Sequence, residues 1–422
     1  MNRRLSMKGI KTLKYIALAI TLVYVCLVSF KNSGDTRVYL AAAQYLSEGQ
    51  SIYGLLVEYN QRGNIEILAS YLYSPFFAVL LLPLTLLPKV VSLFIWHLIN
   101  IYLLYLLFRK MSSYFPACSE KTMVIINSIS FILCLRFFGN NMELGQMSFL
   151  ILALSFLGLD YIMNQRRDIL GGFLLALGII FKILPIVFVP YLLYKGHFKA
   201  TLYVIGFTIL FLLAPALYLG WGDNIDLHAL WFETINPNKD FYALETKAGL
   251  YNLSAYVPAL LSDIPYQGLD DKYNILNLSL DHLKIVINGL RLLFVGFALY
   301  FVGLPNFKGR KMNPKKQFWE WSYLLLVIPL IFPRQSKYSF YFVLPTLYFL
   351  LHSMTTMSKK QIWINITILA TYFILSQLTS VNIIGRTLYD MSQFLKLITY
   401  SCVILIIGLC INKPKTQDVL EE

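Results

Sequence analysis

Gly34-Asp35-Thr36-Arg37-Val38-Tyr39 is a polar segment that closely follows the apolar run from Tyr15 to Phe30. The residues before that run are basic, which is typical of a signal peptide, but no small-x-small cleavage site follows it. We therefore expect an uncleaved membrane anchor with its N-terminus in the cytoplasm. Asp35 would then lie where the chain emerges at the outer face of the bilayer.

The composition indicates a polytopic membrane protein. Hydrophobic residues make up 57% of the 422 residues and charged residues only 14%, so most of the chain needs lipid or a very large apolar core. The 29 tyrosines and 30 phenylalanines suit helix ends at the membrane interface. The five cysteines are scattered and form neither a disulfide framework nor a paired metal motif.

The net charge of +14 is concentrated in clusters between the apolar segments. Such clusters mark cytoplasmic loops, so the charge predicts membrane topology and argues against a nucleic-acid partner. The clusters are Arg3 to Lys14, Arg109/Lys110, Arg166/Arg167, Lys195/Lys199, Lys308 to Lys316, Lys359/Lys360 and Lys413/Lys415. Both termini are then cytoplasmic, and segments 31–75 and 221–284 are outer loops.

The apolar segments predict one all-α membrane domain over residues 1–422, with about 12 spanning helices (about 11 to 13). The segment from Ile169 to Tyr194 is ambiguous. One long helix would place Lys195 and Lys199 outside, whereas two short helices joined at Lys182-Ile183-Leu184-Pro185 keep both inside. We favour two helices, because Pro185 can end a helix just after Lys182.

The first outer loop contains an amphipathic pattern. Val38, Ala42, Tyr45 and Leu46 share one helical face, and Gly49 follows where a helix C-terminus favours glycine. This pattern predicts a helix lying on the membrane surface. Two further outer segments are expected, residues 139–146 as a loop and 221–284 as a partly helical one.

Polar side chains at the outer face are the candidates for chemistry, because such groups at membrane depth usually face a cavity or a partner. They are Asp35, Glu143, Gln146, Lys182, Asn252, Arg334, Gln335 and Lys337. Asp35 is either a helix N-cap or a general base that takes a proton from an acceptor hydroxyl. Lys182 either snorkels to the interface or neutralises a phosphate.

The other candidates also have two interpretations. Arg334 and Lys337 form either an interface anchor or a clamp on an anionic leaving group. Glu143 and Gln146 form either a solvated turn or a site for sugar hydroxyls. Tyr73-Ser74-Pro75 has a simple structural alternative, a helix entry with proline at the first helical position.

No cofactor is expected. None of the five histidines has the spacing of a zinc site, and no nucleotide-binding glycine motif follows a strand pattern. The residues leave a divalent metal requirement open. Asn252-Leu253-Ser254 matches the glycosylation sequon, to which we give little weight.

Several of these stretches, in this order, resemble the family-87 membrane glycosyltransferases, a branch of the GT-C class that uses polyprenyl-phosphate-linked sugars. The matching stretches are Gly34-Asp35 with Val38-Tyr39-Leu40-Ala41-Ala42, Gly49, Tyr53, Tyr73-Ser74-Pro75-Phe76, Gly145-Gln146, Gly171-Gly172, Lys182-Ile183-Leu184-Pro185 and Asn252-Leu253-Ser254. The C-terminal third resembles the family mainly in its pattern of spans. Relatives often carry a histidine in a late outer loop, whereas residues 333–339 contain none.

The resemblance implies a GT-C-like bundle and an inverting transferase, typically for mannose, with Asp35 as catalytic base. A hexose would pass from a polyprenyl-phosphate donor to a lipid-linked or glycan acceptor at the outer face of a bacterial cytoplasmic membrane. We expect the donor phosphate to contact Lys182, Arg334 and Lys337, and the sugar or acceptor to contact Arg37, Tyr39, Tyr73, Glu143, Gln146 and Asn252. Membrane lipids are further expected partners, and no oligomeric state is indicated.

Two other function classes are considered. A lipid-linked-glycan transporter would also have about 12 spans, but with inverted halves and polar residues near mid-membrane. A polysaccharide polymerase or ligase would act on lipid-linked sugars at the same face, and would depend on outer-loop arginines rather than on an aspartate after the first span. The polar residues gather at one face here, which favours the transferase.

Overall fold

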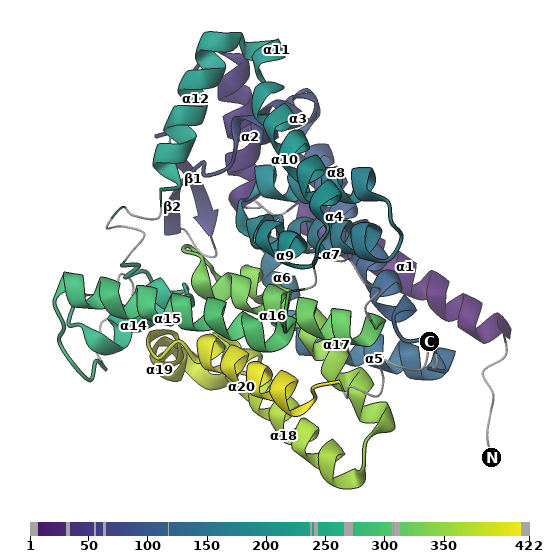
Figure 1. Ribbon diagram of the computed structural model, residues 1–422. Helices are drawn as coiled ribbons and strands as arrows, with labels where there is room; N and C mark the ends of the chain where they lie inside the picture. The colour runs from purple at the N-terminus through teal and green to yellow at the C-terminus, as the bar shows by residue number, and fades with distance from the viewer. Residues whose placement is uncertain are drawn as a thin grey trace.

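The computed structural model describes residues 7–30, 34–54, 56–61, 65–116, 118–236, 239, 244–265, 273–305, 307 and 313–414. Helices make up nearly all of the regular structure of these residues, and one two-stranded hairpin is the exception. In Figure 1 most elements up to α12 form an upper group and those from α14 to α20 a lower group, while α5 lies beside α17 of the lower group. The 3-10 helix η2 of the lower group packs against α6 and α7.

The elements up to α12 are α1 (Met7–Phe30), α2 (Gly34–Ser47), β1 (Leu56–Gln61), β2 (Ile65–Ser70), α3 (Pro75–Thr85), α4 (Lys89–Ser113), α5 (Glu120–Leu133), α6 (Leu135–Leu144), α7 (Ser148–Met163), α8 (Asp168–Phe181), η1 (Leu184–Val187), α9 (Phe188–Tyr194), α10 (Phe198–Leu213), α11 (Ala216–Leu219) and α12 (Trp221–Thr234). The lower group comprises α14 (Leu253–Leu261), α15 (Leu280–Val302), α16 (Pro314–Ile331), η2 (Lys337–Val343), α17 (Leu344–Ser353), η3 (Met354–Thr356), α18 (Lys359–Ser376), α19 (Val381–Phe394) and α20 (Leu397–Ile411).

Three of the described helices are long and apolar enough to cross a membrane: α4, the stretch Phe198–Leu219, and α15. Two bent pairs, α5 with α6 and α18 with α19, raise this number to five if each pair counts as one span. These long apolar helices indicate an integral membrane protein, as the composition predicted. The expected bundle of about 12 spans goes beyond this finding and stays a prediction.

The amphipathic helix expected after the first apolar run is α2. Val38, Ala42 and Leu46 are buried along one of its faces, and the helix ends just before Gly49, whose φ is +71°. Glycine adopts this left-handed conformation at little cost, which explains its place here. The structure adds the antiparallel hairpin of β1 and β2, which the sequence did not predict.

The segment Tyr73-Ser74-Pro75 is a helix entry, the simple alternative considered for it. Ser74 is the N-cap of α3, and its Oγ accepts a hydrogen bond from the backbone N–H of Phe77 at 3.3 Å. Pro75 is the first helical residue, where its missing N–H costs nothing. This entry fixes the position of Tyr73 just before the helix.

The apolar segment 169–194 breaks at Lys182, as predicted. Lys182 is extended, with φ −153° and ψ 117°, and Pro185 follows inside η1. The preceding helix α8 packs closely on α7, since a Cβ at Gly171 would lie 2.6 Å from the carbonyl oxygen of Gly158. This close packing determines where Lys182 leaves the helix. That each half spans the membrane stays a prediction.

One local expectation was wrong. Residues 139–144 were expected in a loop but belong to α6, which is bent by 63° from α5 and ends at Gly145 with φ +63°. The packing of α6 on η2 keeps this segment helical.

Lys195 lies between α9 and α10, where the sequence predicted a loop. The structure adds that its side chain is buried and pairs with Glu320 of α16 at 2.9 Å.

Candidate active site

Asp35 lies in the first turn of α2, as the second residue of the helix. Its carboxylate is half-buried and makes no hydrogen bond or ion pair with any residue that the structure describes. A capping carboxylate would precede the helix and accept a bond from a backbone N–H. The structure therefore does not show the helix-capping alternative.

Two ammonium groups flank Asp35. Lys182 at the end of α8 and Lys247 in the segment before α14 both act on its charge. Burial raises the pKa of Asp35 and the two lysines lower it, which leaves the pKa at about 7. Burial likewise lowers the pKa of Lys182 to about 8, against the opposing effect of Asp35. Neither ammonium lies at ion-pair distance from the carboxylate, so the opposite charges face one another without direct contact.

Tyr39, Tyr73 and Gln146 form a hydrogen-bonded group beside Asp35. Tyr39 is four residues after Asp35, on the same face of α2. The Tyr39 and Tyr73 hydroxyls are 3.0 Å apart, and the Tyr39 hydroxyl donates to Gln146 Oε1 at 3.3 Å. Burial raises the pKa of both phenols, and the Asp35 charge adds to this, so both keep their protons. Four expected site residues thus come together around Asp35 once Lys182 is included.

The first turn of α2 is anchored by the Gly145 carbonyl. Its oxygen accepts hydrogen bonds from Thr36 Oγ1 at 3.0 Å and from Trp96 Nε1 at 2.8 Å. Gly145 ends α6 in a left-handed backbone conformation, which orients this carbonyl toward Thr36 and Trp96. The pair Gly145-Gln146 therefore holds both Thr36 and Tyr39, which follow Asp35 by one and four residues in α2.

Asn252 and Arg334 meet in a second group, organised by Glu245. Asn252 Nδ2 donates to Glu245 Oε2 at 2.7 Å and to the Phe332 carbonyl at 2.9 Å. The backbone N–H of Arg334 donates to Glu245 Oε1 at 2.6 Å. Burial raises the pKa of Glu245 to about 7. Because Glu245 is two residues before Lys247, this group supports the segment that brings Lys247 to Asp35.

Asn252 itself is fully buried, with an exposed fraction of 0%. Its amide nitrogen, the atom that a glycosylation enzyme would modify, is already bonded within the protein. The folded chain therefore presents no acceptor at the Asn252 sequon.

Lys337 contacts Tyr389 of α19. Its Nζ donates to the Tyr389 hydroxyl at 2.6 Å and lies 4.9 Å from the centre of that ring. The neighbouring Tyr338 makes the link to Asp35 instead, because Lys182 Nζ lies 5.6 Å from the centre of its ring. The late segment thus reaches the Asp35 group through an aromatic side chain.

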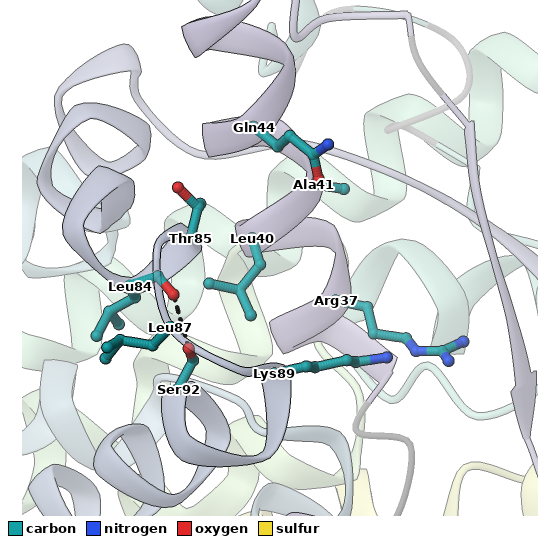
Figure 2. A pocket seen from close by; sticks show the side chains of 9 residues that line it. All are labelled: Arg37, Leu40, Ala41, Gln44, Leu84, Thr85, Leu87, Lys89 and Ser92. Atoms are coloured by element: carbon teal, nitrogen blue, oxygen red, sulfur yellow. Dashed lines mark hydrogen bonds between the residues drawn. The ribbon is translucent and has the colours of Figure 1, made fainter.

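Arg37 and Glu143 have other neighbours among the described residues. Arg37 lines a cavity formed by α2, α3 and the start of α4 (Figure 2). Glu143 is half-buried near the end of α6, within electrostatic range of Tyr24 on α1.

Lys247, Glu245 and Tyr338 were missed as site residues. Lys247 and Glu245 lie in the segment expected as the second large outer loop, and their charge was the only local signal. Tyr338 belongs to the late stretch that was singled out for Arg334 and Lys337. Lys247 is identified by its effect on Asp35, Glu245 by its bonds to Asn252 and Arg334, and Tyr338 by its contact with Lys182, and no spacing along the chain predicts these contacts.

The arrangement offers one carboxylate of raised pKa, two cations and buried phenol donors. A carboxylate can remove a proton, ammonium groups can stabilise an anion, and the phenols can orient the helix that carries the carboxylate. Among the described residues, no three histidine, cysteine, aspartate or glutamate side chains are grouped to hold a metal ion.

Comparison with known proteins identifies the chain by family. Searches of curated proteins and of solved structures return no match. The model of glycosyltransferase family 87 matches residues 71–304, a range that includes Tyr73, Gln146, Lys182 and Lys247, whereas Asp35 precedes it. Because the match covers more than half of the chain, the chain belongs to glycosyltransferase family 87.

Proposed function

We propose that this glycosyltransferase moves a hexose, mannose first among the candidates, from a polyprenyl-phosphate carrier to a lipid-linked or glycan acceptor. The reaction would take place at the outer face of a bacterial cytoplasmic membrane, in a GT-C-like bundle of about 12 helices. One observation carries the proposal. The half-buried Asp35 carboxylate lies beside the ammonium groups of Lys182 and Lys247 and is bonded to none of the described residues.

In the proposed reaction Asp35 acts as general base. It takes the proton of an acceptor hydroxyl while the hydroxyl oxygen attacks the anomeric carbon of the donor sugar. The bond between that carbon and the phosphate oxygen breaks, and the polyprenyl phosphate leaves with the electron pair. Attack from the face opposite the leaving group inverts the anomeric configuration.

Lys182 and Lys247 stabilise the departing phosphate. Charge gathers on the phosphate oxygens as the bond to the sugar breaks, and fixed cations lower the energy of that state. The same cations favour the ionised form of Asp35, as the direction of their effect on its pKa shows. Loss of either lysine should therefore weaken donor binding and make the base harder to ionise.

Tyr39, Tyr73 and Gln146 are assigned to orientation of α2 and to the sugar hydroxyls next to Asp35. Their bonds to one another support the first role, since they fix the face of the helix on which the carboxylate lies. Asn252 and Arg334 are assigned to holding the segment that carries Lys247. Glu143 and Lys337 stay expected contacts, of the acceptor and of the donor respectively.

Asp35→Asn tests the proposal directly. Asparagine keeps the size of the side chain but cannot accept the proton, and general base catalysis typically accounts for a rate factor of about 10²–10⁴. We expect kcat to fall by that factor in a purified, reconstituted enzyme assayed with polyprenyl-phosphate mannose and a lipid-linked acceptor. The yield of folded protein should not change.

Asp223→Asn is the matched control. Asp223 also lies in the first turn of a helix, α12, and its side chain is exposed. Both substitutions remove one first-turn carboxylate, so a general effect on helix electrostatics would appear in both variants. Turnover of Asp35→Asn within a few-fold of the parent would rule out both the residue and the mechanism.

A further inference from the structure

Helix α12 carries an exposed apolar face. Trp221, Ile225 and Phe232 are each more than half exposed. At about 100° per residue these three side chains fall within about 40° of one another around the helix axis. The short helix α11 extends this surface with Leu217, which is 95% exposed. Large apolar side chains that gather on one exposed face usually mark a binding surface.

The acidic side chains of α12 lie on another exposed side. Asp223, Asp226 and Glu233 are exposed and lie about 100–180° from the middle of the apolar face. A helix with one apolar and one charged exposed side suits the boundary between hydrocarbon and water. Inside the hydrocarbon the three carboxylates would lose their hydration, and in water the apolar face would stay uncovered.

The third side of α12 is buried and fixes the helix to the fold. Asn224 Nδ2 donates to the Leu212 carbonyl of α10 at 3.1 Å, and Trp231 Nε1 donates to the Leu72 carbonyl at 3.3 Å. The chain turns into α12 at Gly220, whose φ is +84°. The protein itself therefore determines where the apolar face points.

The chain before α12 indicates what covers the apolar face. The stretch Phe198–Leu219 is long and apolar enough to cross a membrane, and only 17% of its apolar window is buried. Because α12 begins directly after Gly220, Trp221 lies near the level where this stretch leaves the hydrocarbon, a level that tryptophan favours. In Figure 1 α12 runs across the direction of α15, another helix of this kind, and so lies along the membrane plane. The apolar face of α12 thus continues the exposed apolar surface of Phe198–Leu219.

We propose that α12 docks on the membrane, with Trp221, Ile225 and Phe232 about 5–10 Å into the boundary between headgroups and acyl chains. The contact is apolar and needs no anionic lipid, because the exposed charges of the helix are acidic. Through Trp231 the docked helix holds Leu72, the residue before Tyr73, and so connects the membrane surface to the Asp35 group. The inference does not depend on the sugar, the acceptor or the role proposed for Asp35.

Spin labels on neighbouring residues of α12 test the docking, in the full chain reconstituted into phosphatidylcholine vesicles. The labels are placed on Ile225→Cys and, in a second sample, on Asp226→Cys. These exposed positions are adjacent along the helix but lie on different sides of it. We expect the ratio of oxygen accessibility to accessibility of a water-soluble nickel chelate to be severalfold higher at residue 225, at a depth of about 5–10 Å below the lipid phosphates.

Two controls complete the experiment. The background carries serine in place of Cys26, Cys118 and Cys410, the three cysteines that are not buried. The exposed pair Phe232→Cys and Glu233→Cys repeats the comparison about two turns later along α12. A label on Ile209→Cys of α10, which is half exposed, supplies the reference for a side chain in the hydrocarbon.

Three results would overturn the proposal. Higher nickel accessibility at both members of each pair would mean that α12 lies in water. Shielding of residue 225 from both reagents would mean that a protein surface, such as a second copy of the chain, covers the apolar face. A depth that increases steadily from residue 225 to residue 233 on both sides of the helix would make α12 part of a membrane-crossing segment.

Discussion

The pH dependence of kcat/KM should show a narrow maximum near neutrality, because two groups with shifted pKa values must be in opposite protonation states. Asp35 has a pKa of about 7 and must be ionised to act as a base. Lys182 has a pKa of about 8 and must keep its proton to bind the donor phosphate. The profile of kcat/KM reports such groups in the free enzyme.

The magnitude follows from the two ionisation fractions. With these values the product of ionised Asp35 and protonated Lys182 is largest near pH 7.5 and about sixfold smaller at about pH 6 and about pH 9. An aspartate at its ordinary pKa would be almost fully ionised from about pH 6 upward, so the acid side of the profile would be flat. The profile thus separates a perturbed Asp35 from an ordinary one.

Lys182→Gln extends the test. Removing the cation takes away the effect that lowers the pKa of Asp35, so the acid limb should move to higher pH. The alkaline fall should disappear together with the group that causes it. The exposed Lys199 is the matched control, and Lys199→Gln should keep the parent profile. Purified enzyme in proteoliposomes of fixed composition, with initial rates measured at donor concentrations below KM, supplies the assay.

A flat acid limb in the parent would refute the reasoning, and so would an unmoved acid limb in Lys182→Gln. The first result would mean that burial does not raise the pKa of Asp35 in the membrane. The second would mean that Lys182 does not act on it. Either result would mean that the charges around Asp35 do not control the reaction in the way proposed.

Three further outcomes are expected. Lys247→Gln should move the acid limb to higher pH and raise the donor KM, and an unchanged limb would exclude Lys247 from the site. Lys195→Met should destabilise the fold by about 3–5 kcal/mol in detergent unfolding, because it leaves Glu320 buried without its partner, and the additional change Glu320→Leu should recover most of the loss. Gly171→Ala should cost about 1–3 kcal/mol in the same assay, since the added Cβ would meet the Gly158 carbonyl, whereas Gly206→Ala on α10 has open space and should be neutral or better.

The parts of the fold that were predictable from the sequence are those with a local physical signal. The spacing of Val38, Ala42 and Leu46 has the helical period, and α2 buries that face. The break at Lys182 was predicted from the charge distribution and from a proline three residues later, and the chain is extended there. In both cases neighbours in sequence determine the conformation, so no knowledge of the packing was required.

The errors lie where distant contacts decide the outcome. Gly139-Asn140-Asn141 has the composition of a turn, yet packing of α6 against η2 keeps it helical. Lys195 lies between two helices as expected, but its buried partner Glu320 is 125 residues away in sequence and could not be predicted from its neighbours. The hairpin of β1 and β2 lies in the first outer loop, after the predicted helix, where the sequence predicted no strands.

The active site combines both kinds of information. Asp35 was found from local sequence, since it opens the helix that follows the first apolar run, but it lies before the region that the family model matches. Lys182 and Lys247 lie inside that region, and neither is marked as a partner of Asp35 by spacing. Both lysines act on the charge of Asp35, and this effect connects α2 to the region that the family model matches. Charges act over several ångströms, so the two lysines can influence Asp35 without contacting it. The carboxylate therefore stays unpaired among the described residues. A general base needs such an unpaired carboxylate, because it must receive a proton.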